Sequence, residues 1–150
     1  MTDHAHDIDV LNGLIETTLD SCDGYSEAAD QSKNVMIADL FKRWAAERRR
    51  VVADLRTAVR ELGGEPKDDG TVLASAHRVF LDLRAHMSRG DKAVVEEVER
   101  GEDHIKHKFE DALKDEKLGV QARAAVQAAH VSVNSGHDEM RELKLSYEKA

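Results

Sequence analysis

Residues 35–62 read VMIADLFKRWAAERRRVVADLRTAVREL, and this stretch decides the fold. Its apolar positions recur at spacings of three and four, which is the period of an α-helix with one buried face. Gly63-Gly64 follows directly and is a strong stop, because glycine accepts the left-handed conformation at a helix C-terminus. We therefore predict a long helix over 35–62. Its apolar stripe runs Leu40, Trp44, Glu47, Val51, Leu55, Ala58 and Leu62.

Two glutamates occupy positions where this pattern asks for apolar side chains. Glu47 is the first, and Glu102 is the second, in a later helix. A bare carboxylate is costly to bury, so a buried glutamate is normally paired, protonated or bound to a metal. Two of them in one small core predict a site between helices. The later stripe runs Val94, Val98, Glu102, Ile105, Phe109 and Ala112.

The same periodicity predicts further long helices over 8–29, 92–114 and 121–147. Asp7 or Asp9 is expected to cap the first of them, and Asp91 the helix over 92–114. A shorter helix is predicted over 71–87, after a linker in which Pro66 keeps the chain from resuming a helix at once.

Short turns join these long helices into two antiparallel pairs, whereas the segment 63–90 is too long for a tight turn. It is long enough to cross the bundle and carry the short helix. Two hairpins joined by a long crossover is the arrangement of the ferritin-like four-helix bundle. We therefore predict an all-α protein with one domain over 1–150, in which 1–7 form a disordered tail.

Composition limits the cellular location and the classes of binding partner that we expect for this protein. A net charge of −8 argues against a nucleic-acid binder and gives no reason to expect binding to an anionic membrane. Cys22 is the only cysteine, so no disulfide can form within the chain, and its place on the first stripe predicts inert packing. The acidic start has no signal-peptide core and no apolar stretch has the length of a membrane span. We expect a cytoplasmic protein.

The turns predict which candidate ligands lie level with each other. Glu16 and Glu47 are about equally far from the turn near Ser32, while Glu102 and His130 flank the second turn within one helical turn of each other. These four side chains are therefore expected to converge near mid-bundle, one from each long helix. Carboxylates and imidazole suit iron or manganese, which are the cofactors we expect if a metal is bound.

The chain departs twice from the usual di-metal pattern, in which Glu-x-x-His pairs on two helices each grip an ion. Arg50 stands three residues after Glu47, and Gln127 three residues before His130. A protonated Arg50 cannot ligate a metal and can instead pair with Glu47 or Glu102. We place Arg50, Gln127 and His137 around the ligands. The two missing ligands argue against a complete two-ion centre, and a single ion or none fits equally well.

Other features have simpler interpretations. The Arg48-Arg49-Arg50 run favours a solvated basic face, although Arg48 could also pair with a buried glutamate. His104 and His107 are expected to be exposed. Gly101 and Gly136 lie inside predicted helices, where glycine costs about 1 kcal/mol relative to alanine, and such glycines can serve close helix contact.

Several short motifs occur in a characteristic order: residues 11–20, Gly24-Tyr25, Ala28-Ala29, Gly63-Gly64, His77-Arg78, residues 99–103 and His137-Asp138. Together they resemble an uncharacterised bacterial group of ferritin-like four-helix-bundle proteins that is distantly similar to rubrerythrins. The resemblance covers about 11–143 and implies the ferritin-like fold and a metal site around Glu16, Glu47 and Glu102. It supplies no reaction.

Three functions follow from these observations. The first is a metal-binding protein that handles iron or peroxide under stress, and the second is a metal-free interaction module in which a buried Glu-Arg network replaces the ion. The third, an oxidase or peroxidase, needs ligands that the pattern lacks, so enzymatic activity stays open. Self-association is compatible with each of them.

Overall fold

The computed structural model describes residues 4–68 and 90–149, and its helices form an all-α four-helix bundle, as predicted. The predicted short helix over 71–87 lies outside the described residues. Among the residues that are described, no helix has both the length and the apolar character needed to cross a membrane. The helices are α1 (Ala5–Gln31), α2 (Val35–Glu61), α4 (Asp91–Lys114) and α5 (Val120–Lys149).

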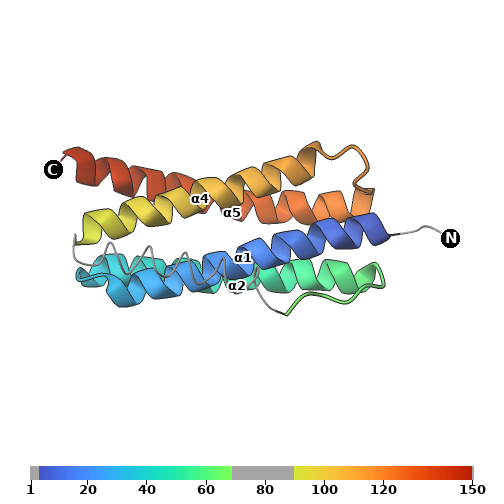
Figure 1. Ribbon diagram of the computed structural model, residues 1–150, viewed down its shortest axis with the longest axis horizontal. Coiled ribbons are helices and arrows are strands. Elements are labelled where there is room, and N and C mark those ends of the chain that lie inside the picture. Colours follow the sequence, from blue (N-terminus) through green and yellow to red (C-terminus); the bar gives the residue numbers. More distant parts are fainter. Residues whose placement is uncertain (1–3, 69–89, 150) are drawn as a thin grey trace.

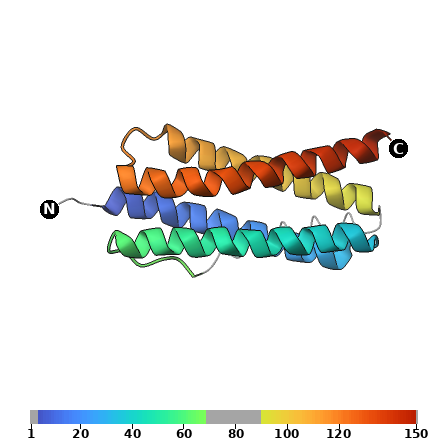
Figure 2. The same ribbon diagram turned by 180° about the vertical axis from the view of Figure 1, so that it is seen from behind.

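The bundle consists of two antiparallel hairpins laid against each other (Figure 1). Helix α1 packs along α2, and α4 packs along α5, while α1 also contacts α4 and α2 contacts α5. Figure 2 shows the α2 and α5 side from behind. The α1–α2 turn, the start of α4 and the C-terminus lie at one end of the bundle, and the α4–α5 turn and the N-terminus lie at the other.

Helix α2 begins at a side-chain cap, whereas the aspartates predicted to cap α1 and α4 do something else. Asn34 caps α2 by accepting hydrogen bonds from the backbone N–H groups of Met36 (2.9 Å) and Ile37 (3.3 Å). The cap residues of α1 and α4 are His4 and Gly90, and neither makes a side-chain cap bond. The predicted capping roles of Asp7, Asp9 and Asp91 are therefore wrong.

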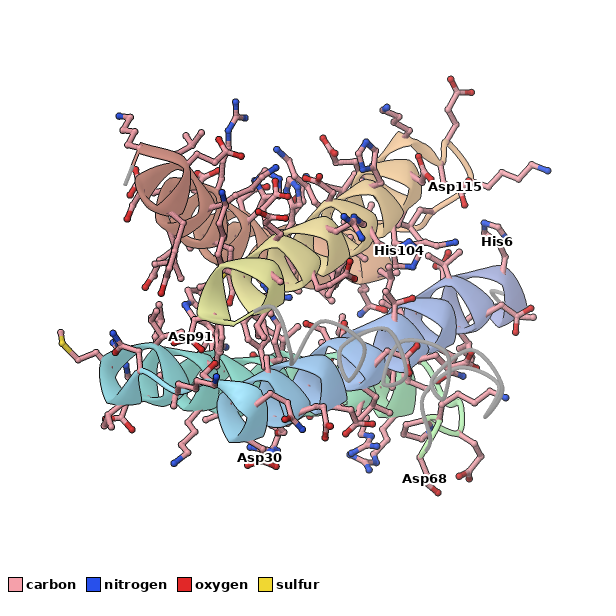
Figure 3. The ribbon with its side chains drawn as sticks, turned by 60° about the vertical axis from the view of Figure 1, so that its left-hand side comes forward. His6, Asp30, Asp68, Asp91, His104 and Asp115 are labelled. Atoms are coloured by element: carbon pink, nitrogen blue, oxygen red, sulfur yellow. The ribbon has the colours of Figure 1, made fainter. Side chains whose placement is uncertain are left out.

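Asp7 and Asp91 instead tie the two hairpins together. Asp91 accepts hydrogen bonds from the backbone N–H groups of Lys33 (2.8 Å) and Asn34 (2.9 Å), so the start of α4 is fixed to the α1–α2 turn (Figure 3). At the opposite end, Asp7 Oδ1 accepts from the N–H of Gly119 at 3.0 Å. Each carboxylate satisfies backbone donors that a turn leaves without partners.

The predicted disordered tail over 1–7 is corrected for residues 5–7, because α1 already begins at Ala5. His6 Nε2 lies 2.6 Å from Asp115 Oδ2 at the end of α4, a pair that Figure 3 shows side by side. This contact, with the bond from Asp7, gives the first turn of α1 partners in the other hairpin. Chain ends stay ordered when they are tied down in this way.

The apolar core is divided into two clusters along the bundle axis. One surrounds Ile15, Leu55 and Phe109, and the other surrounds Phe41 and Met140. The buried residues that fall between the clusters on α2, α4 and α5 are Arg48, Glu99, Glu102, Gly136 and His137.

The buried face of α2 is shifted by one residue from the predicted stripe. Arg48, not Glu47, continues the buried series, and its side chain is fully shielded from solvent. The prediction that Arg48 belongs to a solvated face is therefore wrong. The buried residues of α2 are Ile37, Phe41, Ala45, Arg48, Val51, Val52, Leu55 and Val59.

Candidate functional site

The polar layer between the two apolar clusters is built on a buried ion pair. Arg48 Nη2 donates to Glu102 Oε2 at 2.6 Å, and Arg48 Nη1 donates to Ser21 Oγ at 2.8 Å. Tyr25 Oη donates to the other carboxylate oxygen of Glu102 at 2.8 Å. Glu102 is therefore buried as predicted, and Arg48 supplies its compensation, one of the two arginine partners that the sequence suggested.

Aromatic rings surround this ion pair. The guanidinium carbon of Arg48 lies 5.6 Å from the ring centroids of both Tyr25 and Trp44, within the range of a cation–π contact. Burial, followed by the negative charge of Glu102, raises the pKa of Tyr25 well above its ordinary value. Tyr25 thus keeps its proton and remains a hydrogen-bond donor to the carboxylate.

Gly136 leaves the space that the ion pair fills. A Cβ built on Gly136 would overlap Arg48 Nη2 and lie 3.1 Å from Glu102 Oε2. This glycine serves close contact between helices, as the sequence suggested. A Cβ on Gly101 would meet nothing within 4 Å, so Gly101 does not serve close helix contact.

Glu47 lies at the edge of the bundle, with about a third (32%) of its side chain exposed. Its carboxylate accepts hydrogen bonds from Arg50 Nε (2.8 Å) and Nη2 (2.6 Å), and Ser132 Oγ donates to it at 2.5 Å. The bond from Arg50, assisted by Ser132, lowers the pKa of Glu47 to about 2. The predicted pairing of Arg50 with Glu47 is confirmed.

The other predicted ligands do not join Glu102 in a group of three candidate metal ligands within the described residues. Glu16 is half-buried and approaches Lys67 Nζ at 3.7 Å. His130 is partly buried, and its Nε2 is buried without a hydrogen-bond partner in the described part of the chain, while Gln127 is exposed. Glu16, Glu47, Glu102 and His130 supply no group of three candidate ligands among residues 4–68 and 90–149. Metal binding by these residues stays a prediction.

The described residues do form one group of three candidate metal ligands, and it lies between α4 and α5. Glu99, Asp103 and His137 each offer one ligand atom, and these atoms lie within 4.8 Å of one another. Glu99 and Asp103 are one helical turn apart on α4, so they share a face. His137 Nε2 on α5 contacts Asp103 Oδ1 at 2.6 Å and is almost completely buried.

Two further charges border this group. Lys144 Nζ lies 3.5 Å from Glu99 Oε2, whose side chain is only 12% exposed. His137 Nδ1 faces Asp138 Oδ1 at 3.4 Å. His104 and His107, on the same helix as Glu99, are exposed as predicted.

Sequence reasoning placed His137 beside a metal site but missed Glu99 and Asp103 as its partners. The sequence analysis singled out residues 99–103 only as one of the motifs that resemble the family. The i, i+4 carboxylate pair was the available signal, because such a pair on one helix face can grip an ion together with a histidine from a neighbouring helix.

Comparison with known proteins identifies a family but no activity. A family described as a domain of unknown function, DUF2383, matches residues 6–115. Searches among curated proteins and among solved structures find no match. The matched span holds α1, α2 and α4, and with them Arg48, Glu102, Glu99 and Asp103. The predicted resemblance to an uncharacterised family is thus confirmed at this level, and the chain belongs to the DUF2383 family.

Proposed function

We propose that the protein binds one divalent transition-metal ion, manganese(II) or iron(II), between α4 and α5. Glu99, Asp103 and His137 are its protein ligands. The observation that carries the proposal is the approach of three ligand atoms, from two helices, to within 4.8 Å of one another.

The spacing of these atoms suits an ion. Metal–oxygen and metal–nitrogen bonds of about 2.1 Å place neighbouring ligands about 3 Å apart. The 2.6 Å between His137 Nε2 and Asp103 Oδ1 is close to this separation, so a small outward movement makes room for an ion. Two carboxylates with one imidazole form a donor set that suits manganese or iron.

The burial of Glu99 favours a cation at this place. Its carboxylate is largely withdrawn from water, and the ammonium group that faces it stands 3.5 Å away. A buried carboxylate is costly unless its charge is compensated at close range. An ion bound to Glu99 supplies that compensation more directly than Lys144 does.

His137 is positioned to exchange a proton for a metal ion. As a ligand, its Nε2 must be free of hydrogen, so binding releases a proton whenever that nitrogen carries one. Its Nδ1 then donates toward Asp138, and such a carboxylate partner orients a ligating histidine. Three protein ligands leave further coordination positions open to water or a small oxidant.

Metal handling under stress and the ferritin-like relationship belong to this proposal. They are supported by the paired hairpins and by the motifs that resemble ferritin-like proteins. Cytoplasmic location stays a prediction.

The test is a calorimetric titration, in which manganese(II) is added to the chelator-treated protein and the heat of binding is measured. We expect one ion per chain for the native sequence, and loss of binding in His137→Ala and in Asp103→Asn. His104→Ala, which removes an exposed histidine from α4, is the matched control and should bind normally. Equal binding by His137→Ala and the native protein would refute the proposal.

The second candidate is a metal-free interaction module, favoured by the Arg48–Glu102 pair. Here a guanidinium, rather than an ion, neutralises the buried carboxylate at the centre of the bundle. Under this alternative, chelators leave the melting temperature unchanged, and added manganese(II) gives no stabilisation. The metal-binding proposal instead requires that manganese(II) raise the melting temperature, because a ligand that binds only the folded state stabilises it.

A further inference from the structure

We infer that Lys144 is a built-in competitor for the metal site, so that ion binding is an exchange of one cation for another. The inference rests on the proposed function and names how that site is regulated. In the ion-free protein, the ammonium group of Lys144 pairs with Glu99, and an entering ion must displace it.

The position of Lys144 supports this role. It lies seven residues after His137 on α5, which is two helical turns and the same face. Its Nζ reaches Glu99 Oε2 at 3.5 Å, whereas His137 contacts Asp103, one turn further along α4. On α5, Lys144 therefore pairs with Glu99 and His137 pairs with Asp103.

The helix that carries Lys144 is held in place on both sides of it. Leu143 and Tyr147 pack against the apolar cluster that contains Phe41 and Met140. The backbone at residue 144 is thereby fixed beside α4, while the lysine side chain remains a third (33%) exposed. Its flexible four-carbon stem can then turn toward solvent without moving the helix.

Electrostatics makes the two cations compete. A carboxylate that ligates a divalent ion has little charge left to stabilise an ammonium group, and the ammonium repels the ion at close range. The native lysine therefore weakens ion binding. Loss of its charge, by substitution or by acetylation of the amine, removes the competitor and tightens binding.

The test compares manganese(II) affinity in four chelator-treated proteins: the native chain, Lys144→Met, Lys144→Arg and Lys149→Met. Lys144→Met keeps an apolar stem but removes the charge, and we expect it to bind about three- to tenfold more tightly. Lys144→Arg keeps the charge and should bind like the native protein. Lys149→Met makes the same change in net charge at the end of α5 and should also have little effect.

The outcomes separate this inference from the proposed function. If the native protein binds manganese(II) and Lys144→Met binds no more tightly, the competition is refuted while the metal site stands. If Lys144→Met binds and the native chain does not, the competition is supported in its strongest form, while the proposed metal binding by the native chain is refuted. If neither protein binds, both proposals fall. Circular dichroism of each variant checks that α5 remains helical.

Discussion

Arg48 and Glu102 form a fully buried ion pair, with 2.6 Å between Nη2 and Oε2, at the level where the two apolar clusters of the bundle meet. Ser21 and Tyr25 occupy further hydrogen-bonding positions around the pair. A buried pair of this kind contributes less to stability than its short distance suggests, because both charges have lost their hydration. Removing only one partner has a larger effect on stability, because it leaves the other charge buried without compensation.

The first prediction concerns single and double removal of this pair. Glu102→Gln leaves the charge of Arg48 buried without its counter-ion and should destabilise the fold by about 3–5 kcal/mol. Replacing both residues, as Arg48→Met with Glu102→Met, removes both charges and should restore most of that loss. Urea unfolding followed by circular dichroism, in the presence of a chelator, measures both effects. A double variant less stable than Glu102→Gln would contradict this account.

The second prediction compares two glycines inside helices. Alanine at a helix interior is favoured over glycine by about 1 kcal/mol, so Gly101→Ala, which meets open space, should stabilise the protein by up to that amount. Gly136→Ala should do the opposite and cost about 1–3 kcal/mol, because its methyl group overlaps Arg48 Nη2. Melting temperatures of the two variants check the sign. Stabilisation by Gly136→Ala would show that the pair can move aside freely.

The helices of the bundle were predictable because periodicity and glycine stops are local signals. The phase of α2 was harder to predict. The predicted stripe through Trp44 and Glu47 and the observed one through Ala45 and Arg48 lie on adjacent faces, about 100° apart, and both carry apolar residues. Hydrophobicity alone ranked Glu47 and Arg48 as equally poor core residues. Only the opposing carboxylate on α4, a tertiary feature, selects Arg48.

The four predicted ligands supply no group of three in the described part of the chain, and helix geometry offers a reason. Counting equal numbers of residues from a turn ignores the lean of side chains toward the N-terminus of their own helix. In an antiparallel hairpin this lean brings a residue of the helix before the turn into contact with a residue of the helix after the turn that lies farther from it. Asp103 stands 14 residues before Lys117, but its partner His137 stands 20 residues after it. The equal-distance rule therefore paired Glu102 with His130.

The third prediction is a pH dependence carried by Glu47. Its folded pKa of about 2 lies below the ordinary value of 4.5, so the unfolded chain binds more protons between these limits. Glu47 therefore stabilises the fold fully above about pH 5, and this contribution is lost as the pH falls toward 2. The effect should stay below about 1 kcal/mol, because the pair with Arg50 is partly exposed and screened by water.

Glu47→Gln isolates this contribution. The variant should be less stable than the native protein at pH 7 and converge with it near pH 2, as judged by urea midpoints across the range. Asp54→Asn removes the other carboxylate that binds Arg50 and is the control, since it leaves the bonds between Glu47 and both Arg50 and Ser132 in place. A constant difference between Glu47→Gln and the native chain at every pH would reject the assignment.

The fourth prediction concerns the thiol of Cys22, which lies in the apolar cluster with Ile15 and Val51. Burial raises the pKa of Cys22 to about 11, with a partly offsetting contribution from the positive charge of Arg49. Because the thiolate is the reactive form, the folded protein should react with a disulfide reagent at pH 8 far more slowly than a free thiol does. In urea the same cysteine should react at the ordinary rate.

The native-state rate of Cys22 modification thus reports opening of the α1–α2 hairpin. Glu102→Gln should accelerate this modification by lowering the stability of the fold. Fast reaction in the native protein would place Cys22 in contact with solvent.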